Sequence, residues 1–175
     1  MKIIEAIKKI YPTIQGGFVY WETQNDLTPW ENPIDGLVWE NTEFSKPTWE
    51  QIEAQLGIVE LEEAKTSKLA LLLTGRKDFQ YKNVVVGGVT YTATQTACTN
   101  LDGAISVLTD NGLTQCNWLD ANGNASVLTL VGAKQLRTAM FMQQSSAYVQ
   151  EAASKAEIAA CESVEEVNAL DITFN

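Results

Sequence analysis

The chain contains no histidine and only three cysteines among its 175 residues. Without histidine, neither a Ser-His-Asp nor a Cys-His nucleophilic arrangement can be built. Cys98, Cys116 and Cys161 are odd in number, widely spaced and without a CxxC pair. We therefore expect neither a zinc site nor a disulfide framework, and interpret the cysteines as small buried or half-buried residues. The sequence predicts no catalytic residue, no metal and no cofactor.

Basic residues are also scarce, with 12 Lys and Arg against 22 Asp and Glu, for a net charge of −10. A phosphate-binding groove needs clustered positive charge, and these basic residues are scattered, so we expect no nucleic-acid partner. No apolar run approaches the roughly 20 residues of a membrane span, so we expect no membrane insertion. The opening MKIIEAIKKI lacks the continuous apolar region of a signal peptide, which predicts synthesis in a cytoplasm.

Apolar residues make up 45% of the chain, as in ordinary globular proteins. The pattern predicts an α+β fold: a small helical domain with a β-hairpin and an additional strand, plus a loop-rich N-terminal arm that starts with a short amphipathic helix. We divide the chain into a Trp-rich attachment arm at residues 1–47, a connecting helix at 48–75 and a compact α+β domain at 76–175.

The arm opens with an amphipathic helix that Pro12 ends, and glycines and prolines then punctuate short apolar segments up to residue 47. An arm of this composition is expected to bury too little apolar area to fold alone, because ordering costs about 1–2 kcal/mol per residue. We therefore expect rapid proteolysis before Thr48 in the isolated chain. Large aromatic rings in such an arm are anchors against the arm itself or a partner. The predicted partner-binding residues are Ile3, Ile7, Ile10, Phe18, Trp21, Trp30, Trp39 and Trp49.

Residues 48–51 form a capping box, in which Thr48 and Gln51 satisfy each other's backbone donors, so a helix begins there. We expect Gly57 to weaken this helix, with a break and a restart at Ile58. Its apolar seam fits either a coiled coil between subunits or packing on the chain's own core.

The longest amphipathic pattern begins at Leu130 and continues to Ile158, with Thr129 as the predicted N-cap. Before it, the sequence predicts a hairpin at 84–92 around Gly87-Gly88, a helix at 96–108, and strands around Trp118 and at 126–129 joined by a turn at 120–124. A second capping box at 163–166 opens a short helix.

The segment that starts at Asp120 begins like a calcium loop, but residues 125 and 131 depart from that pattern, so we interpret the segment as a turn. Met140 and Met142 beside Phe141 fit either core filling or an adaptable recognition surface.

This order of elements carries a resemblance. Five features carry it: a charged helix, a Gly-Gly hairpin ending in Tyr91-Thr92, the stretch 118–123, the long helix and the segment 158–167. With these features, about residues 58–175 resemble a domain of unknown function that recurs in phage tail-fibre and tail-module proteins. The opening residues 3–12 resemble the start of small proteins encoded in phage tail operons, and residues 46–52 are similar to a junction found in tail-fibre assembly proteins.

The resemblance implies a non-enzymatic role in a bacteriophage tail, as a baseplate or fibre component whose arm contacts neighbouring tail subunits. It also implies a homo-oligomer, of which a trimer is one form, located in the host cytoplasm during synthesis and then in the virion tail. Two alternatives stay open: a cytoplasmic fibre-assembly chaperone that is absent from the particle, and a receptor-binding tip that recognises glycans through Trp21, Trp30 or Trp39.

Overall fold

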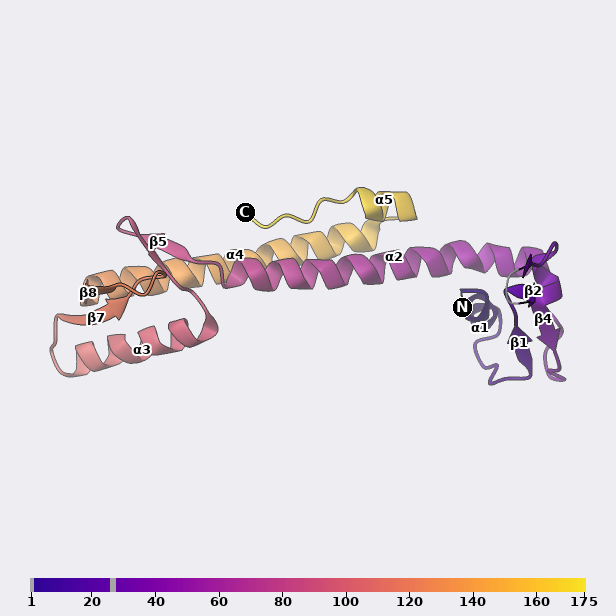
Figure 1. Cartoon of the computed structure of the whole chain (residues 1–175), viewed down its shortest axis with the longest axis horizontal. Coiled ribbons are helices and arrows are strands. Elements are labelled where there is room, and N and C mark those ends of the chain that lie inside the picture. Colours follow the sequence, from indigo (N-terminus) through magenta and orange to yellow (C-terminus); the bar gives the residue numbers. More distant parts are fainter. Residues whose placement is uncertain (1, 26–27) are drawn as a thin grey trace. The chain divides into compact units, whose positions relative to one another are not determined.

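The structure is a computed structural model that describes residues 2–25 and 28–175; Met1, Asp26 and Leu27 of the predicted arm lie outside the described residues. It is a mixed helix and strand structure with small hairpins, 57% helical, which confirms the predicted α+β class (Figure 1). The chain divides into two compact units. The first unit comprises Met1–Ser67 and Cys161–Ala169, and the second comprises Lys68–Ala160 and Leu170–Asn175.

The first unit is built from a short helix and small antiparallel ribbons. The helix α1 (Lys2–Ile10) starts the chain, as predicted. β1 (Phe18–Tyr20) pairs with β4 (Leu37–Trp39), and β2 (Thr23–Asn25) pairs with β3 (Thr28–Pro29). The 3-10 helix η1 (Pro33–Gly36) leads into β4, and α5 (Val164–Ala169) also belongs to this unit.

The predicted arm shares a hydrophobic core with the helix that follows it. The buried residues of this core are Ala6, Ile7, Ile14, Leu37, Ile52 and Val59. Ile52 and Val59 come from α2 (Trp49–Gln80), which sequence analysis had assigned to a separate connecting segment. The helix thus supplies apolar surface that residues 1–47 lack when they are considered alone.

The helix α2 is continuous past Gly57, so the expected break does not occur. The capping box is confirmed, because the Thr48 backbone N–H donates to Gln51 Oε1 at 2.9 Å and the Gln51 N–H donates to Thr48 Oγ1 at 3.4 Å. Gly57 is exposed, and one such glycine costs a long helix only about 1 kcal/mol relative to alanine. The boundary between the units falls after Ser67 within α2, and not at residues 47 and 75. The sequence does not predict this boundary, because a helical pattern does not show against which core each turn of the helix packs.

The second unit places two hairpins and two helices around one core. Its elements are the part of α2 from Lys68 onward, β5 (Val84–Val86), β6 (Val89–Tyr91), α3 (Gln95–Asp110), β7 (Gln115–Leu119), β8 (Ala125–Thr129) and α4 (Leu130–Ala160). Gly87 and Gly88 have φ values of +60° and +81°, which a tight turn of the predicted hairpin requires. Ala121 N–H donates to Thr90 O at 2.9 Å, which links the two hairpins. The core residues are Val84, Tyr91, Ala93, Cys98, Leu101, Leu128, Ala133, Leu136 and Met140.

The C-terminal end of the chain is fastened to the second unit. The Gln150 side chain accepts from the Asn175 backbone N–H and donates to its carbonyl, both at 3.0 Å. Phe174 stacks on Phe79 of α2 with ring centroids 5.9 Å apart, and lies over Gly75. Among the described residues, no helix combines the length and the apolar content that a bilayer crossing requires.

Candidate functional site

Six of the eight predicted partner-binding residues pack within the first unit. Ile7 is fully buried, and the others that pack against the same core are partly buried: Ile3, Ile10, Phe18, Trp39 and Trp49. These side chains hold the first unit together. The two remaining residues, Trp21 and Trp30, lie outside this cluster.

Trp39 is committed to internal contacts. Its ring stacks on Phe18 at 5.5 Å and lies 6.0 Å from Tyr11, while its indole N–H donates to Phe44 O at 2.9 Å. Tyr11 in turn lies 4.8 Å from the Phe44 ring and donates its hydroxyl to Ser45 O at 2.9 Å. A ring fixed in this way acts as a structural anchor, which disfavours its use as a platform for a sugar.

One apolar surface of the first unit is exposed on the outer side of the β1–β4 ribbon. Side chains alternate along these strands, so Phe18 and Tyr20 face the core while Val19 and Trp21 face outward. Val19 pairs directly with Val38, and the ribbon continues because Trp21 N–H donates to Gly36 O at 2.8 Å. Val19, Trp21 and Val38 are 49%, 59% and 46% exposed, and we call this surface the hairpin face.

Gly36 fixes the position of the hairpin face. A Cβ atom at this residue would lie 2.1 Å from the Trp21 carbonyl oxygen and 2.9 Å from Cδ1 of Trp30. Only a glycine allows the backbone at Trp21 to approach so closely. Gly36 is one of the glycines that punctuate the short apolar segments of the predicted arm, and its close contact with two predicted site residues is evident only in three dimensions.

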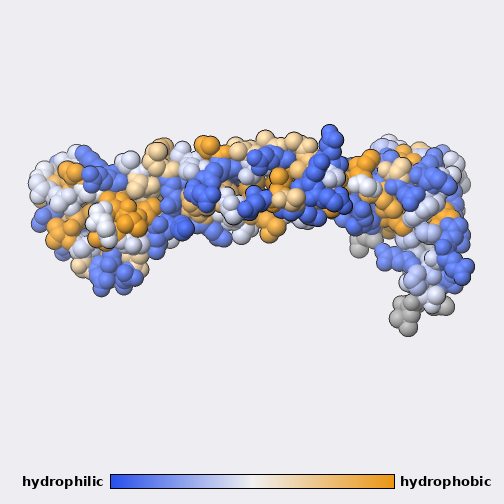
Figure 2. Space-filling view, turned by 90° about the horizontal axis from the view of Figure 1, so that it is seen from above, coloured by the Kyte–Doolittle hydropathy of each residue, from blue (hydrophilic) through white to orange (hydrophobic). Residues whose placement is uncertain are grey.

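A longer apolar surface covers the outer side of α4 in the second unit. Its large members are at least half exposed: Val131 66%, Phe141 56%, Met142 62%, Tyr148 53% and Val149 68%. Together with the smaller exposed residues between them, they form what we call the α4 outer face: Val131, Lys134, Thr138, Phe141, Met142, Ser145, Tyr148, Val149, Ala152 and Ala156. A shallow hollow of about 430 Å³ lies on it, lined by Phe141, Gln144, Ser145, Tyr148, Val149 and Ala152. Figure 2 shows apolar residues, in orange, at the surface among hydrophilic ones.

The apolar residues of the amphipathic pattern predicted from Leu130 to Ile158 lie on two different sides of α4. Leu136, Met140 and Ile158 are buried, whereas Tyr148 and Ala156 are exposed on the outer face. The methionines divide in the same way, because Met140 fills the core and Met142 is exposed beside Phe141. The buried and the exposed apolar stripes have the same helical period and differ only in their angle around the helix axis. The signal that sequence reasoning missed is the presence of two such stripes at different angles.

A buried ion pair holds α4 against α2 beside the outer face. Glu151 Oε2 lies 3.1 Å from Arg76 Nε, an ion-pair distance without hydrogen-bond alignment, and Glu151 Oε1 lies 2.6 Å from Lys155 Nζ. The hydrogen bond with Lys155, together with the charges of Lys155 and Arg76, holds the pKa of Glu151 below its ordinary value. The Arg76 guanidinium lies 5.0 Å from the centroid of the Tyr148 ring, so it also fixes that ring.

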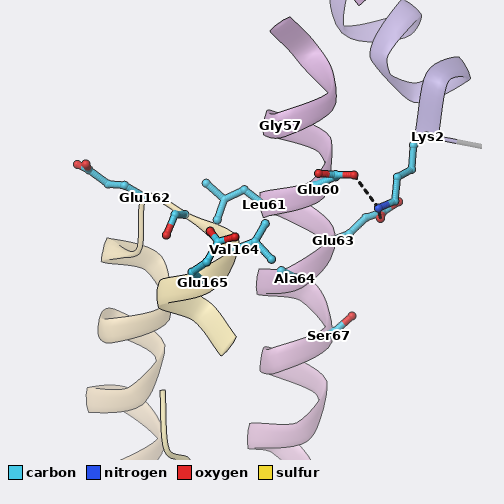
Figure 3. Close-up of a pocket in the computed structure, with 11 residues that line it drawn as sticks. Lys2, Gly57, Glu60, Leu61, Glu63, Ala64, Ser67, Glu162, Val164 and Glu165 are labelled. Carbon is cyan, nitrogen blue, oxygen red and sulfur yellow. Dashed lines mark hydrogen bonds and ion pairs between the residues drawn. The ribbon is translucent and has the colours of Figure 1, made fainter. Parts of the chain in front are cut away.

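The first unit contains an acidic groove of about 720 Å³ between α1, α2 and α5. Lys2 Nζ lies 3.0 Å from Glu60 and 3.7 Å from Glu63, and the hydrogen bond with Glu60 raises the pKa of Lys2. Figure 3 shows this contact on one side of Leu61, with Glu165 on the other. Within residues 2–25 and 28–175, no three His, Cys, Asp or Glu side chains are grouped to hold a metal ion.

The turn after β7 uses its carboxylate internally. Asp120 Oδ1 accepts from the backbone N–H groups of Asn122 and Asn124, both at 2.8 Å, and Oδ2 accepts from Asn124 Nδ2 at 3.0 Å. These bonds, led by the one from the Asn124 side chain, lower the pKa of Asp120. The turn predicted in place of a calcium loop is therefore confirmed.

Comparison with known proteins identifies one family. The model described as "Domain of unknown function (DUF4376)" matches residues 63–174, which is more than half of the chain. The chain therefore belongs to this family. No curated protein and no solved structure matches it.

Proposed function

We propose that this member of the DUF4376 family is a structural component of a bacteriophage tail, at the baseplate or fibre, and attaches to neighbouring tail subunits through its N-terminal unit. The proposal starts from the resemblance of residues 58–175 to a phage tail domain and of residues 3–12 and 46–52 to tail-operon proteins. The structural observation that supports it is the hairpin face, an exposed apolar surface in the unit expected to make the attachment.

The hairpin face has the chemistry of a protein contact. Trp21 is 59% exposed and lies on the same side of the ribbon as Val19 and Val38. An aromatic ring that stays exposed loses the free energy that its burial would provide, and such rings are enriched at the centres of interfaces. The attachment surface proposed here is therefore smaller than the predicted set of eight residues, because most of those residues form the core beneath it.

A non-enzymatic role is part of the proposal. The chain has no histidine, so a histidine-dependent nucleophile is excluded by its composition. Among the described residues, the carboxylates with lowered pKa values are Glu50, Asp120 and Glu151, which are engaged by the cap of α2, by a turn and by an ion pair. Each arrangement has a structural explanation, so none requires a catalytic one.

The alternative of a fibre-assembly chaperone is kept because residues 46–52 resemble a junction of assembly proteins. In the structure this junction begins α2, with Pro47 fully buried and Thr48 as the N-cap. Its residues therefore have a structural role, which is to start the helix. The resemblance alone supports the alternative. A virion component and a chaperone differ in one observable property, which is their presence in the finished particle.

Quantitative mass spectrometry of purified virions tests the proposal. We expect the wild-type protein in a fixed ratio to the tail subunits, and a Trp21→Ala variant that folds normally but is incorporated at least about tenfold less, as for an interface hot spot. Leu119→Ala, a change at a 60% exposed apolar residue of the second unit, is the matched control and should be incorporated normally. Absence of the wild-type protein from the particle would favour the chaperone, and normal incorporation of the Trp21 variant would exclude the hairpin face as the attachment surface.

A further inference from the structure

We infer that the α4 outer face is a self-association surface, on which two copies of this chain pair through antiparallel α4 helices about a two-fold axis near Ser145. This inference is independent of the proposed tail function. It concerns only residues of the second unit, and it names a two-fold pair where sequence analysis expected a homo-oligomer with a trimer as one form.

The α4 outer face is large and continuous. α4 spans 31 residues, about 46 Å at 1.5 Å per residue, and exposed outer-face residues recur every three or four positions from Val131 to Ala156. Five large side chains that are at least half exposed, with the small residues between them, present on the order of 700 Å² per copy, close to the roughly 800 Å² per partner of a standard interface. A surface of this extent is large for a monomer and is sufficient for a dimer.

The α4 outer face is also complementary to itself. Leu130 and Ala160 are the ends of α4, so Ser145 is its midpoint. A two-fold axis at Ser145 opposes Phe141 to Val149, Met142 to Tyr148 and Thr138 to Ala152, each residue meeting its counterpart in the other copy, as an isologous interface requires. Large residues then face smaller or flexible ones, and the small Ser145 side chains allow the two helices to approach at the axis.

Charge supports both the choice of partner and the direction of pairing. The chain carries a net charge of −10, so two copies repel each other over most of their surfaces, yet the outer face carries Lys134 and no acidic residue. Antiparallel pairing brings Lys134 near Glu157 of the second copy, whereas parallel pairing would oppose Lys134 to itself. The antiparallel helix dipoles are also favourably arranged.

The Tyr148 ring is prepared for such a contact. Arg76 lies over it at 5.0 Å and is itself held by Glu151 at 3.1 Å, so the ring is supported from the side of its own chain. Tyr148 and Phe141 flank the hollow around Ser145, into which Met142 and Val149 of the second copy would pack. A side chain already fixed in position loses less conformational freedom on association.

The oligomeric state of the full chain tests the surface. Sedimentation over a concentration series should show a monomer–dimer equilibrium, and Val149→Glu should weaken dimerisation at least tenfold while leaving the circular dichroism spectrum unchanged. Val85→Glu is the matched control, because Val85 is 65% exposed on β5 of the same unit and does not belong to the outer face, so it should leave dimerisation unchanged. A monomer at every concentration, a trimer, or equal weakening by both variants would overturn the inference.

Disulfide trapping tests the direction. In a Cys116→Ser background, with Cys98 and Cys161 buried, a mixture of Thr138→Cys and Ala152→Cys chains should form a covalent heterodimer on mild oxidation, while either variant alone should stay uncrosslinked. Ser145→Cys alone should form a covalent homodimer. Crosslinking of the Thr138 variant with itself would show a parallel arrangement and would overturn the antiparallel pair.

Discussion

Replacing Ile7 by alanine should unfold the first unit locally and leave the second unit folded. Ile7 is fully buried in a core that includes Ile14, Leu37 and Ile52, so its truncation leaves a cavity that neighbouring side chains fill only in part. Changes of this type cost about 2–5 kcal/mol. At about 0.05–0.15 kcal/mol per residue, a unit of this size has roughly 4–11 kcal/mol of stability, so the loss is a large fraction of the total.

The assay is limited trypsin digestion of the full chain, followed by intact mass. Each 1.4 kcal/mol changes an equilibrium tenfold, so the opening that exposes Lys8, Lys9 and Lys46 should become roughly thirty-fold to several thousand-fold more frequent. Lys46 is a useful reporter, because its Nζ donates to Leu37 O at 2.8 Å and is held within the folded unit. The wild-type chain should resist cleavage before Thr48, and the Ile7→Ala variant should be cut there first.

The matched control is Ile58→Ala, because Ile58 is 45% exposed on α2 and its truncation removes the same atoms without a cavity. This variant should keep the cleavage rate of the wild type to within a few-fold. If the wild-type chain is cut before Thr48 as rapidly as the Ile7 variant, residues 1–47 have no stable core in solution, and the arm expected from the sequence is the better description.

Three further predictions follow from individual contacts. Gly36→Ala should destabilise the first unit by about 1–3 kcal/mol, the range of overpacking, and shift its near-ultraviolet spectrum, because the added Cβ meets the Trp21 carbonyl at 2.1 Å; an unchanged melting midpoint would contradict this contact. Glu151→Gln should cost about 1–3 kcal/mol at pH 7 by urea denaturation. Because the folded pKa of Glu151 lies below its unfolded value of 4.5, its contribution is present above pH 4.5 and is lost as the pH falls through the folded pKa, so the two proteins should converge in acid. Phe174→Ala should increase amide hydrogen exchange in residues 170–175 and remove about 0.5–1.5 kcal/mol of stacking with Phe79, and unchanged exchange would show that the tail is not docked.

Local signals in the sequence were sufficient to place the starts of several helices. Thr129 caps α4 through a 3.0 Å bond from Gly132 N–H to its Oγ1, and Ser163 Oγ accepts from Glu166 N–H at 3.1 Å at the start of α5, both as predicted. In the second case the Glu166 carboxylate accepts from Glu162 N–H, one residue before the expected partner. These motifs are predictable because donor and acceptor lie within four residues, so no distant part of the chain is needed to bring them together.

The candidate sites were less accessible from the sequence. Trp21 was among the residues named, but so were Ile7 and Trp39, which the structure places in the core or packed against it. All three are large and apolar, and composition alone cannot separate a residue that anchors its own unit from one that faces outward. Separation depends on tertiary packing, since alternation from β1 to Trp21 places Val19 and Trp21 on one side of the ribbon, and these two stay exposed because the core packs against the other side.

The sequence by itself determined where the capped helices begin, the positions of several turns, the absence of histidine chemistry and the acidic net charge, since each depends on neighbouring residues or on totals. Only the tertiary structure decided that residues 1–47 share a core with α2, and which apolar stripe of α4 is buried and which is exposed. The physical reason is that a residue is buried only when a second surface packs against it. The α4 sequence carries both stripes at the same period, and the stripe against which α3 and the hairpins pack is the one removed from water.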